Sequence, residues 1–282
     1  MFLLFYNTNI IFCSSATKSS KQLLSKNDHS LRLWGSHARL ARIRGKIDEA
    51  RKVYETVLGT LQEQTKDSSV LWWDYAEMLW LNGNNRDALD VVIRSSGQRG
   101  GSSTIIVLRA KRHLEEMIEG VITDLSNWRS TLSLIKLRIL LELLTSSLQN
   151  AVDLGRRYLS LAYNAAKLHE GVVVGLLAVI YHHTVTLRNH AAPALLREVA
   201  HEAIKKYPDN TIVMGILLES EKGEALWGRI RLVLGDSLQG SSEKSVVRRL
   251  SEVWAAGWDV GRWQGEIERV RAGLEAAVTS DL

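Results

Sequence analysis

The chain contains few cysteines and prolines, and both shortages restrict the class of protein it can be. Its 282 residues include one cysteine, Cys13, and two prolines, Pro193 and Pro208. A single cysteine forms no intramolecular disulfide, so a reducing compartment, the nucleus or the cytosol, fits best. Because proline interrupts helices, its scarcity permits long helices. We therefore expect an all-α protein.

The motifs of common catalytic and metal sites are also missing. The His-Glu pairs at 169–170 and 201–202 begin the zinc-protease pattern HExxH, but valine and lysine occupy the position of its second histidine. His182 and His183 lie about 100° apart around a helix, so we expect one buried and one exposed structural histidine rather than a metal site. No P-loop, dinucleotide-binding fingerprint or nucleophile elbow occurs. We predict that the protein is not an enzyme and has no catalytic residue, cofactor, metal ion or small-molecule substrate.

Positive charge is concentrated near the start of the chain. The net charge is +5, yet residues 51–282 carry 28 basic and 28 acidic residues, against 8 and 3 in residues 1–50. Within the basic part, Arg39 and Arg42 share a helix face because they lie three residues apart. We predict a contact surface for RNA or a protein partner that comprises Arg39, Arg42, Arg44 and Lys46.

Two apolar segments resemble targeting or membrane segments. The initial run MFLLFYNTNIIFC has no preceding basic residue, is interrupted by Asn7 and Asn9, and is too short to span a bilayer. We expect residues 1–29 to be disordered, or to include sequence wrongly assigned to the protein. We interpret Gly171–Tyr181 as a buried central helix, because eleven residues do not span a membrane.

Two segments of the chain, residues 31–58 and 70–96, repeat one pattern 38 residues apart. The residues that define it are Trp34, Ala38, Gly45, Ala50 and Tyr54 in the first segment and Trp72, Tyr75, Ala76, Gly83 and Ala88 in the second. A period of roughly 34 to 47 residues is typical of helical hairpins that bury their apolar faces against neighbouring hairpins. The pattern predicts an α-solenoid of antiparallel helix pairs, a fold suited to binding.

The tryptophans near the repeats have two predicted positions. Trp34 and Trp72, at repeat spacing, are expected to lie as wedges in the core between helices. Trp73 cannot share a helix face with Trp72, so Trp73 and Trp80 are better candidates for exposure. Trp80 lies about one turn beyond Tyr75 and Ala76, so a buried position stays open for it.

Turn-forming residues divide the rest of the chain. Glycine- and serine-rich stretches predict loops, and three-and-four spacing of apolar residues predicts helices that begin near residues 104, 128, 148, 171, 194, 211 and 225. The predicted organisation is two repeats over 30–97, a flexible loop over 98–103, a central helical-repeat region over 104–234, a flexible loop over 235–245 and a C-terminal helix pair over 246–282.

Several short motifs resemble those of known helical-repeat proteins. Leu33-Trp34, Tyr75-Ala76 and the run Ala50–Glu55 (ARKVYE) resemble the half-a-TPR (HAT) repeat, which is typical of RNA-processing proteins. Over roughly residues 30–280, further motifs follow in an order similar to the fungal branch of the nuclear RNAi-defective ("necessary for RNA interference") family. They are Leu71–Met78 (LWWDYAEM), Tyr181–His183 (YHH), Tyr207–Thr211 (YPDNT) and Leu218–Gly223 (LESEKG).

This resemblance implies a nuclear, non-enzymatic scaffold that recruits protein partners. The implied processes are small-RNA-mediated gene silencing (RNA interference), heterochromatin formation, and nuclear RNA processing and surveillance. The implied partners are the DExH-box helicase linked to the nuclear exosome and splicing factors of the spliceosome. The alternative is an RNA-binding component of a splicing or RNA-processing ribonucleoprotein. Neither interpretation involves a membrane.

Overall fold

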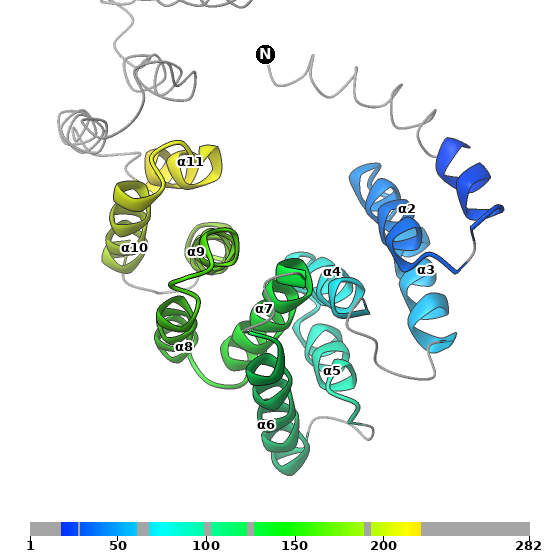
Figure 1. The fold of residues 1–282 in the computed structure, drawn as a ribbon, viewed down its shortest axis with the longest axis horizontal. Coiled ribbons are helices and arrows are strands. Elements are labelled where there is room, and N and C mark those ends of the chain that lie inside the picture. Colours follow the sequence, from blue (N-terminus) through cyan, green and yellow to red (C-terminus); the bar gives the residue numbers. More distant parts are fainter. Residues whose placement is uncertain are drawn as a thin grey trace, which may run out of the picture. The chain divides into compact units, whose positions relative to one another are not determined.

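The structure is a computed structural model that describes residues 18–27, 29–60, 68–98, 103–122, 127–188 and 193–220 (Figure 1). Every regular element in these ranges is a helix, so the expected all-α class is confirmed for them. The main elements are α2 (Leu31–Ile43), α3 (Ile47–Thr60), α4 (Ser68–Leu81), α5 (Asn85–Ser95), α6 (Thr104–Val121), α7 (Trp128–Thr145), α8 (Leu148–Leu161), α9 (Ala166–Tyr181), η2 (His182–Thr186), α10 (Pro193–Lys206) and α11 (Thr211–Ser220).

Most of the predicted helix starts agree with the structure. Those near residues 104, 128, 148, 194 and 211 match the starts of α6, α7, α8, α10 and α11 to within one residue. The chain divides into two compact units, Met1–Val172 and Val173–Leu282. Predicted segments that lie outside the described residues are 1–17, most of the 98–103 loop, the predicted helix near 225, the 235–245 loop and the 246–282 helix pair.

Helices α2 to α5 form two hairpins that repeat in register. A shift of 38 residues places the first residue of α2 on residue 69, next to the start of α4, and its last residue on Leu81, where α4 ends. The same shift places the start of α3 on Asn85, where α5 begins. The alanines of the pattern have no exposed surface in either hairpin, and they are Ala38, Ala50, Ala76 and Ala88.

Both hairpins turn at a glycine in the left-handed backbone region. Gly45 has a φ of 74° and Gly83 a φ of 82°. In each turn the residue after the glycine donates its N–H to a carbonyl five residues back, and the N···O distance is 3.0 Å both for Lys46 to Ala41 and for Asn84 to Leu79. This is the Schellman closure, which satisfies free carbonyls at the end of a helix and favours glycine.

We expect Gly83→Ala to lower the free energy of unfolding by about 1 kcal/mol, because a side chain strains this positive φ. No atom lies within 4 Å of the added Cβ, so the cost comes from the backbone and not from a clash. The matched control is Gly215→Ala inside α11, which also has open space and is expected to raise stability by about 0.5–1 kcal/mol. Urea denaturation measures both; effects of the same sign would contradict this account.

α4 and α7 lie at the centre of the first unit. α4 packs against α2, α3, α5 and α7, and α7 also packs against α5, α6 and α8. With neighbours on several sides, α4 buries Trp72, Trp73 and Trp80, each at most 7% exposed. The expectation that Trp73 is exposed is therefore wrong, and of the two positions left open for Trp80 the structure shows the buried one. Trp34, at the equivalent position in α2, is only partly buried, since α2 packs mainly against α3 and α4.

The apolar helix expected over Gly171–Tyr181 is longer than the sequence pattern suggested. α9 begins at Ala166 and continues through the π-helical turn η2, so the helix spans Ala166–Thr186, or 21 residues. By length and composition it is the one helix among the described residues that reaches the dimensions of a membrane span. Its length therefore no longer argues against a membrane span, as the length of eleven residues did. Its most apolar stretch is 56% buried within the protein, and core helices meet the same criterion.

In the second unit, α10 and α11 pack against each other as a hairpin. Asn210 caps α11, because its Oδ1 accepts hydrogen bonds from the N–H groups of Ile212 and Val213 at 3.0 and 3.1 Å. Ile204 on α10 and Leu217 on α11 have no exposed surface.

Candidate functional site

A groove runs between α2, α4 and α7 in the first unit. Two hollows of 370 and 560 Å³ overlap there and share Arg39, Val70, Asp74 and Arg129 in their walls. The charged lining residues are five basic and two acidic ones, Arg32, Arg39, Arg42, Arg129 and Lys136 against Asp74 and Glu77. The groove therefore carries an excess of positive charge.

Arg39 and Arg42 reach from α2 to carboxylates on α4. Arg39 binds Asp74 through two hydrogen bonds, Nε to Oδ2 at 2.8 Å and Nη2 to Oδ1 at 2.9 Å, and Arg42 Nη1 donates to Glu77 Oε2 at 2.8 Å. Burial raises the pKa of Asp74, and the hydrogen bonds from Arg39 oppose that rise. These two predicted contact residues join α2 to α4, and carboxylates of the chain itself offset much of their charge.

The structure does not bring the other two predicted contact residues into the groove. Arg44 is the C-cap of α2, and Lys46 forms an ion pair with Glu49 on α3. The predicted basic patch therefore divides into two residues that line the groove and two that lie at the turn between α2 and α3.

α7 supplies two groove cations that sequence analysis missed. The Arg129 guanidinium lies 5.2 Å from the ring centroid of Trp128, and Lys136 Nζ lies 5.3 Å from that of Trp73. Within the described part of the chain, neither cation forms an ion pair with a carboxylate, and burial lowers the pKa of Lys136. Their seven-residue spacing on one helix face is a signal in the sequence, but only the fold places them opposite Arg39 and Arg42.

The repeat tyrosines join the two hairpins beside this groove. Tyr54 on α3 and Tyr75 on α4 stack with ring centroids 5.3 Å apart, and burial raises the pKa of both hydroxyls. The Tyr75 hydroxyl donates to Glu55 Oε1 at 2.8 Å, and Arg51 binds both Glu55 and Asp87, at 3.1 and 3.0 Å. These contacts link α3 to both helices of the second hairpin.

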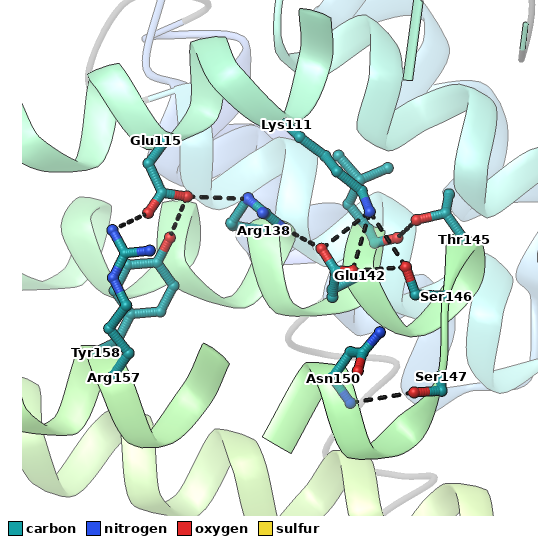
Figure 2. Close-up of polar contacts among 11 residues, drawn as sticks. Lys111, Glu115, Arg138, Glu142, Thr145, Ser146, Ser147, Asn150, Arg157 and Tyr158 are labelled. Carbon is teal, nitrogen blue, oxygen red and sulfur yellow. Dashed lines mark hydrogen bonds and ion pairs between the residues drawn. The ribbon is translucent and has the colours of Figure 1, made fainter. Parts of the chain in front are cut away.

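A second charged cluster connects α6, α7 and α8 (Figure 2). Glu115 Oε2 accepts from Arg138 Nε at 3.2 Å and from the Tyr158 hydroxyl at 3.0 Å, while Glu115 Oε1 pairs with Arg157 Nη2 at 2.7 Å. Arg138 also donates through Nη1 to Glu142 Oε2 at 2.8 Å. Because two or more donors hold each carboxylate, the cluster reads as a structural clamp between three helices rather than as an acid–base site.

Glu142 accepts hydrogen bonds from three side chains of this clamp. Lys111 Nζ and the Ser146 hydroxyl donate to Oε1 at 3.0 and 2.6 Å, in addition to the Arg138 bond. Burial acts to raise the pKa of Glu142, but hydrogen bonds from Ser146, Arg138 and Lys111 together lower it to about 2. Glu142 therefore stays ionised far into the acid range.

This pKa predicts how stability depends on pH. The folded-state pKa of Glu142 lies below its ordinary value of 4.5, so the folded state binds fewer protons than the unfolded state between these values. The stabilisation, about 3 kcal/mol, is complete above about pH 5 and is lost as the pH falls towards 2. Urea titrations across this range should show a flatter pH profile for Glu142→Gln. The control Glu116→Gln, at a side chain that is 54% exposed, should keep the profile of the native chain; equal flattening in both would contradict the assignment.

The structure agrees with the prediction of one buried and one exposed histidine only in part. His182 is buried and His183 is partly exposed, and burial lowers the pKa of His183. In the ranges that the structure describes, no group of three or more His, Cys, Asp or Glu side chains has the arrangement of a metal site.

The motifs that suggested a family fall on elements of the fold. Ala50–Glu55 lies in α3, Leu71–Met78 lies in α4, and Tyr207–Thr211 joins α10 to α11. Comparison of the chain with protein-family models and with curated proteins gives no match. The likeness to the nuclear RNAi-defective family therefore rests on these motifs alone.

Proposed function

We propose that this protein is a non-enzymatic helical-repeat scaffold, an α-solenoid of HAT/TPR-like helix pairs that recruits protein partners along its groove. Two hairpins in 38-residue register support the repeat assignment. The observation that carries the binding assignment is the pair of cations on α7, Arg129 and Lys136. They lie in the groove against tryptophan rings, and neither forms an ion pair with a carboxylate of the described ranges. Buried or stacked cations of this kind favour an anionic ligand group.

The groove fits an acidic protein segment better than RNA. Asp74 and Glu77 lie in the same groove and oppose a continuous phosphate backbone. Trp73 is buried and the Trp128 ring already carries Arg129, so neither presents an open face for a base to stack on. A peptide places separate carboxylates near Arg129 and Lys136, so it adds less negative charge beside Asp74 and Glu77 than a continuous phosphate backbone does.

The cellular role that we propose follows from the motif resemblance. The scaffold works in the nucleus, in small-RNA-mediated gene silencing and in nuclear RNA processing or surveillance. Its partners are the exosome-linked helicase and splicing factors. The alternative is a direct RNA-binding component of a ribonucleoprotein. Affinity purification of the tagged chain from nuclei, with and without RNase, separates the two: partners retained after RNase support the scaffold, and partners lost on RNase support the RNA-binding alternative.

Combined Arg129→Glu and Lys136→Met substitutions are expected to weaken binding of a fluorescent peptide rich in Asp and Glu at least about tenfold, measured by anisotropy. The control is Lys52→Glu, which reverses an exposed charge on α3 outside the groove and should leave affinity unchanged. Thermal unfolding checks that both variants fold. Unchanged peptide affinity in the groove variant would refute the proposed site, and tighter, equally sensitive binding of single-stranded RNA would favour the alternative.

A further inference from the structure

Lys136 lines the larger hollow of the groove, of 560 Å³, and keeps part of its surface open to solvent. We propose that Lys136 is a modification site, at which the ε-amine accepts an acyl group from an acyl thioester. The modification replaces one cation of the groove with a neutral amide. The site itself does not depend on the proposed function, but its effect on partner binding rests on that function.

The contacts of Lys136 leave its amine free to react. Its Nζ lies 5.3 Å from the ring centroid of Trp73, and within the described ranges it forms no ion pair with a carboxylate. Lys111 on α6 is also poorly exposed, but its Nζ pairs with Glu142 at 3.0 Å and donates to Ser146 at 3.3 Å. A carboxylate partner favours the ammonium ion, which has no lone pair with which to attack a carbonyl. The two lysines are therefore expected to differ in reactivity.

The surroundings of Lys136 favour the neutral amine. Burial lowers the pKa of Lys136 below its ordinary value of 10.5, Glu77 and Asp74 oppose this effect, and Arg39 adds to it. The charged side chains that line the same hollow are Arg39, Arg42, Asp74, Glu77 and Arg129. Because a lysine with a lowered pKa carries more neutral amine at a given pH, it is the better nucleophile near neutrality.

The proposed reaction is an acyl transfer. The lone pair of the neutral Lys136 Nζ attacks the thioester carbonyl carbon, an N–C amide bond forms and the C–S bond breaks. The sulfur leaves as a thiolate and takes up the proton that the nitrogen loses, so atoms and charge balance without a further reactant. The apolar side chains of the hollow suit a short alkyl group on the acyl carbon, and they are Ile43, Val70, Trp73, Trp128 and Leu132.

Mass spectrometry of the chain treated with S-acetyl-N-acetylcysteamine, a small thioester, tests the site. We expect Lys136 to be acetylated at least about tenfold faster than Lys111, because only Lys111 has a carboxylate partner. The rate at Lys136 should be half-maximal at a pH below 10.5. Acetylation of the exposed Lys52 shows that the reagent is active.

Unfolding provides the control for these rates. In guanidinium chloride Lys136 and Lys111 should react at similar rates, because both amines then lose their folded surroundings. A rate at Lys136 no greater than that at Lys111 in the folded chain would overturn the site. A half-maximal rate at or above pH 10.5, or a difference that persists after unfolding, would also overturn it.

The effect on the groove is measured by anisotropy with the fluorescent peptide rich in Asp and Glu. The acetylated chain should bind it at least about threefold more weakly than the untreated chain. Lys136→Arg, which keeps a cation but lacks the amine, should lose no affinity on the same treatment. Equal losses in both chains would overturn the effect on binding. If the untreated chain does not bind the peptide, the proposed function fails, while the acetylation rates still decide the modification site.

Discussion

Replacement of Ala76 by tryptophan is expected to destabilise the first unit by at least about 3 kcal/mol and to unfold the repeat. Ala76 has no exposed surface and lies on α4, which packs against four other helices. An indole has no space there without displacing these helices. Overpacking usually lowers the free energy of unfolding by about 1–3 kcal/mol, and we expect this substitution to reach or exceed the upper value. Circular dichroism during thermal unfolding measures the loss.

Ala166→Trp is the matched control, because it makes the same substitution at an exposed alanine at the start of α9. We expect a change within about 0.5 kcal/mol. If Ala76→Trp unfolds at the same temperature as the native chain, the placement of Ala76 at a close helix contact, and with it the 38-residue alignment, is wrong.

Arg138→Met is expected to lower the free energy of unfolding by about 3–5 kcal/mol. Arg138 is 9% exposed and contacts both Glu115 and Glu142, so its removal leaves two poorly exposed carboxylates with fewer donors. The loss should be largest above about pH 5, where Glu142 is ionised in both the folded and the unfolded chain. Urea denaturation at pH 7 and at low pH measures it.

Arg112→Met provides the comparison, because Arg112 also pairs with a glutamate four residues away, Glu116, but is 83% exposed. An exposed pair of this kind contributes about 0.5 kcal/mol or less. Equal costs for the two substitutions would show that the α6–α7–α8 clamp does not hold the helices together.

Local features of the fold follow closely from the sequence. Gly45 and Gly83 predict the hairpin turns because only a residue without a side chain adopts their positive φ easily. Buried alanines at 38-residue spacing predict the helix register because small residues mark close helix contacts. The start of α9 is less visible, since Lys167, His169 and Glu170 interrupt the apolar pattern before the continuous apolar run that begins at Gly171.

Features that depend on contacts between helices far apart in the chain cannot be predicted from local sequence patterns. The exposure predicted for Trp73 is wrong because α7, more than fifty residues later in sequence, lies against α4. The basic patch read from the sequence contains Arg39 and Arg42, whose carboxylate partners lie 35 residues away. The groove cations Arg129 and Lys136 complete the candidate site only after folding, so local spacing shows half of it.

The connection between the two hairpins differs in chemistry from the centre of the unit. Arg39–Asp74, Arg42–Glu77 and Arg51–Asp87 all link the first hairpin to the second, and each includes a partner that is at least 25% exposed. Dissolved ions screen such pairs, whereas the apolar contact of α4 with α7 has no charges to screen. The electrostatic part of the attachment between the two hairpins is therefore expected to weaken as ionic strength rises, while the stacked tyrosines Tyr54 and Tyr75 keep the hairpins in contact.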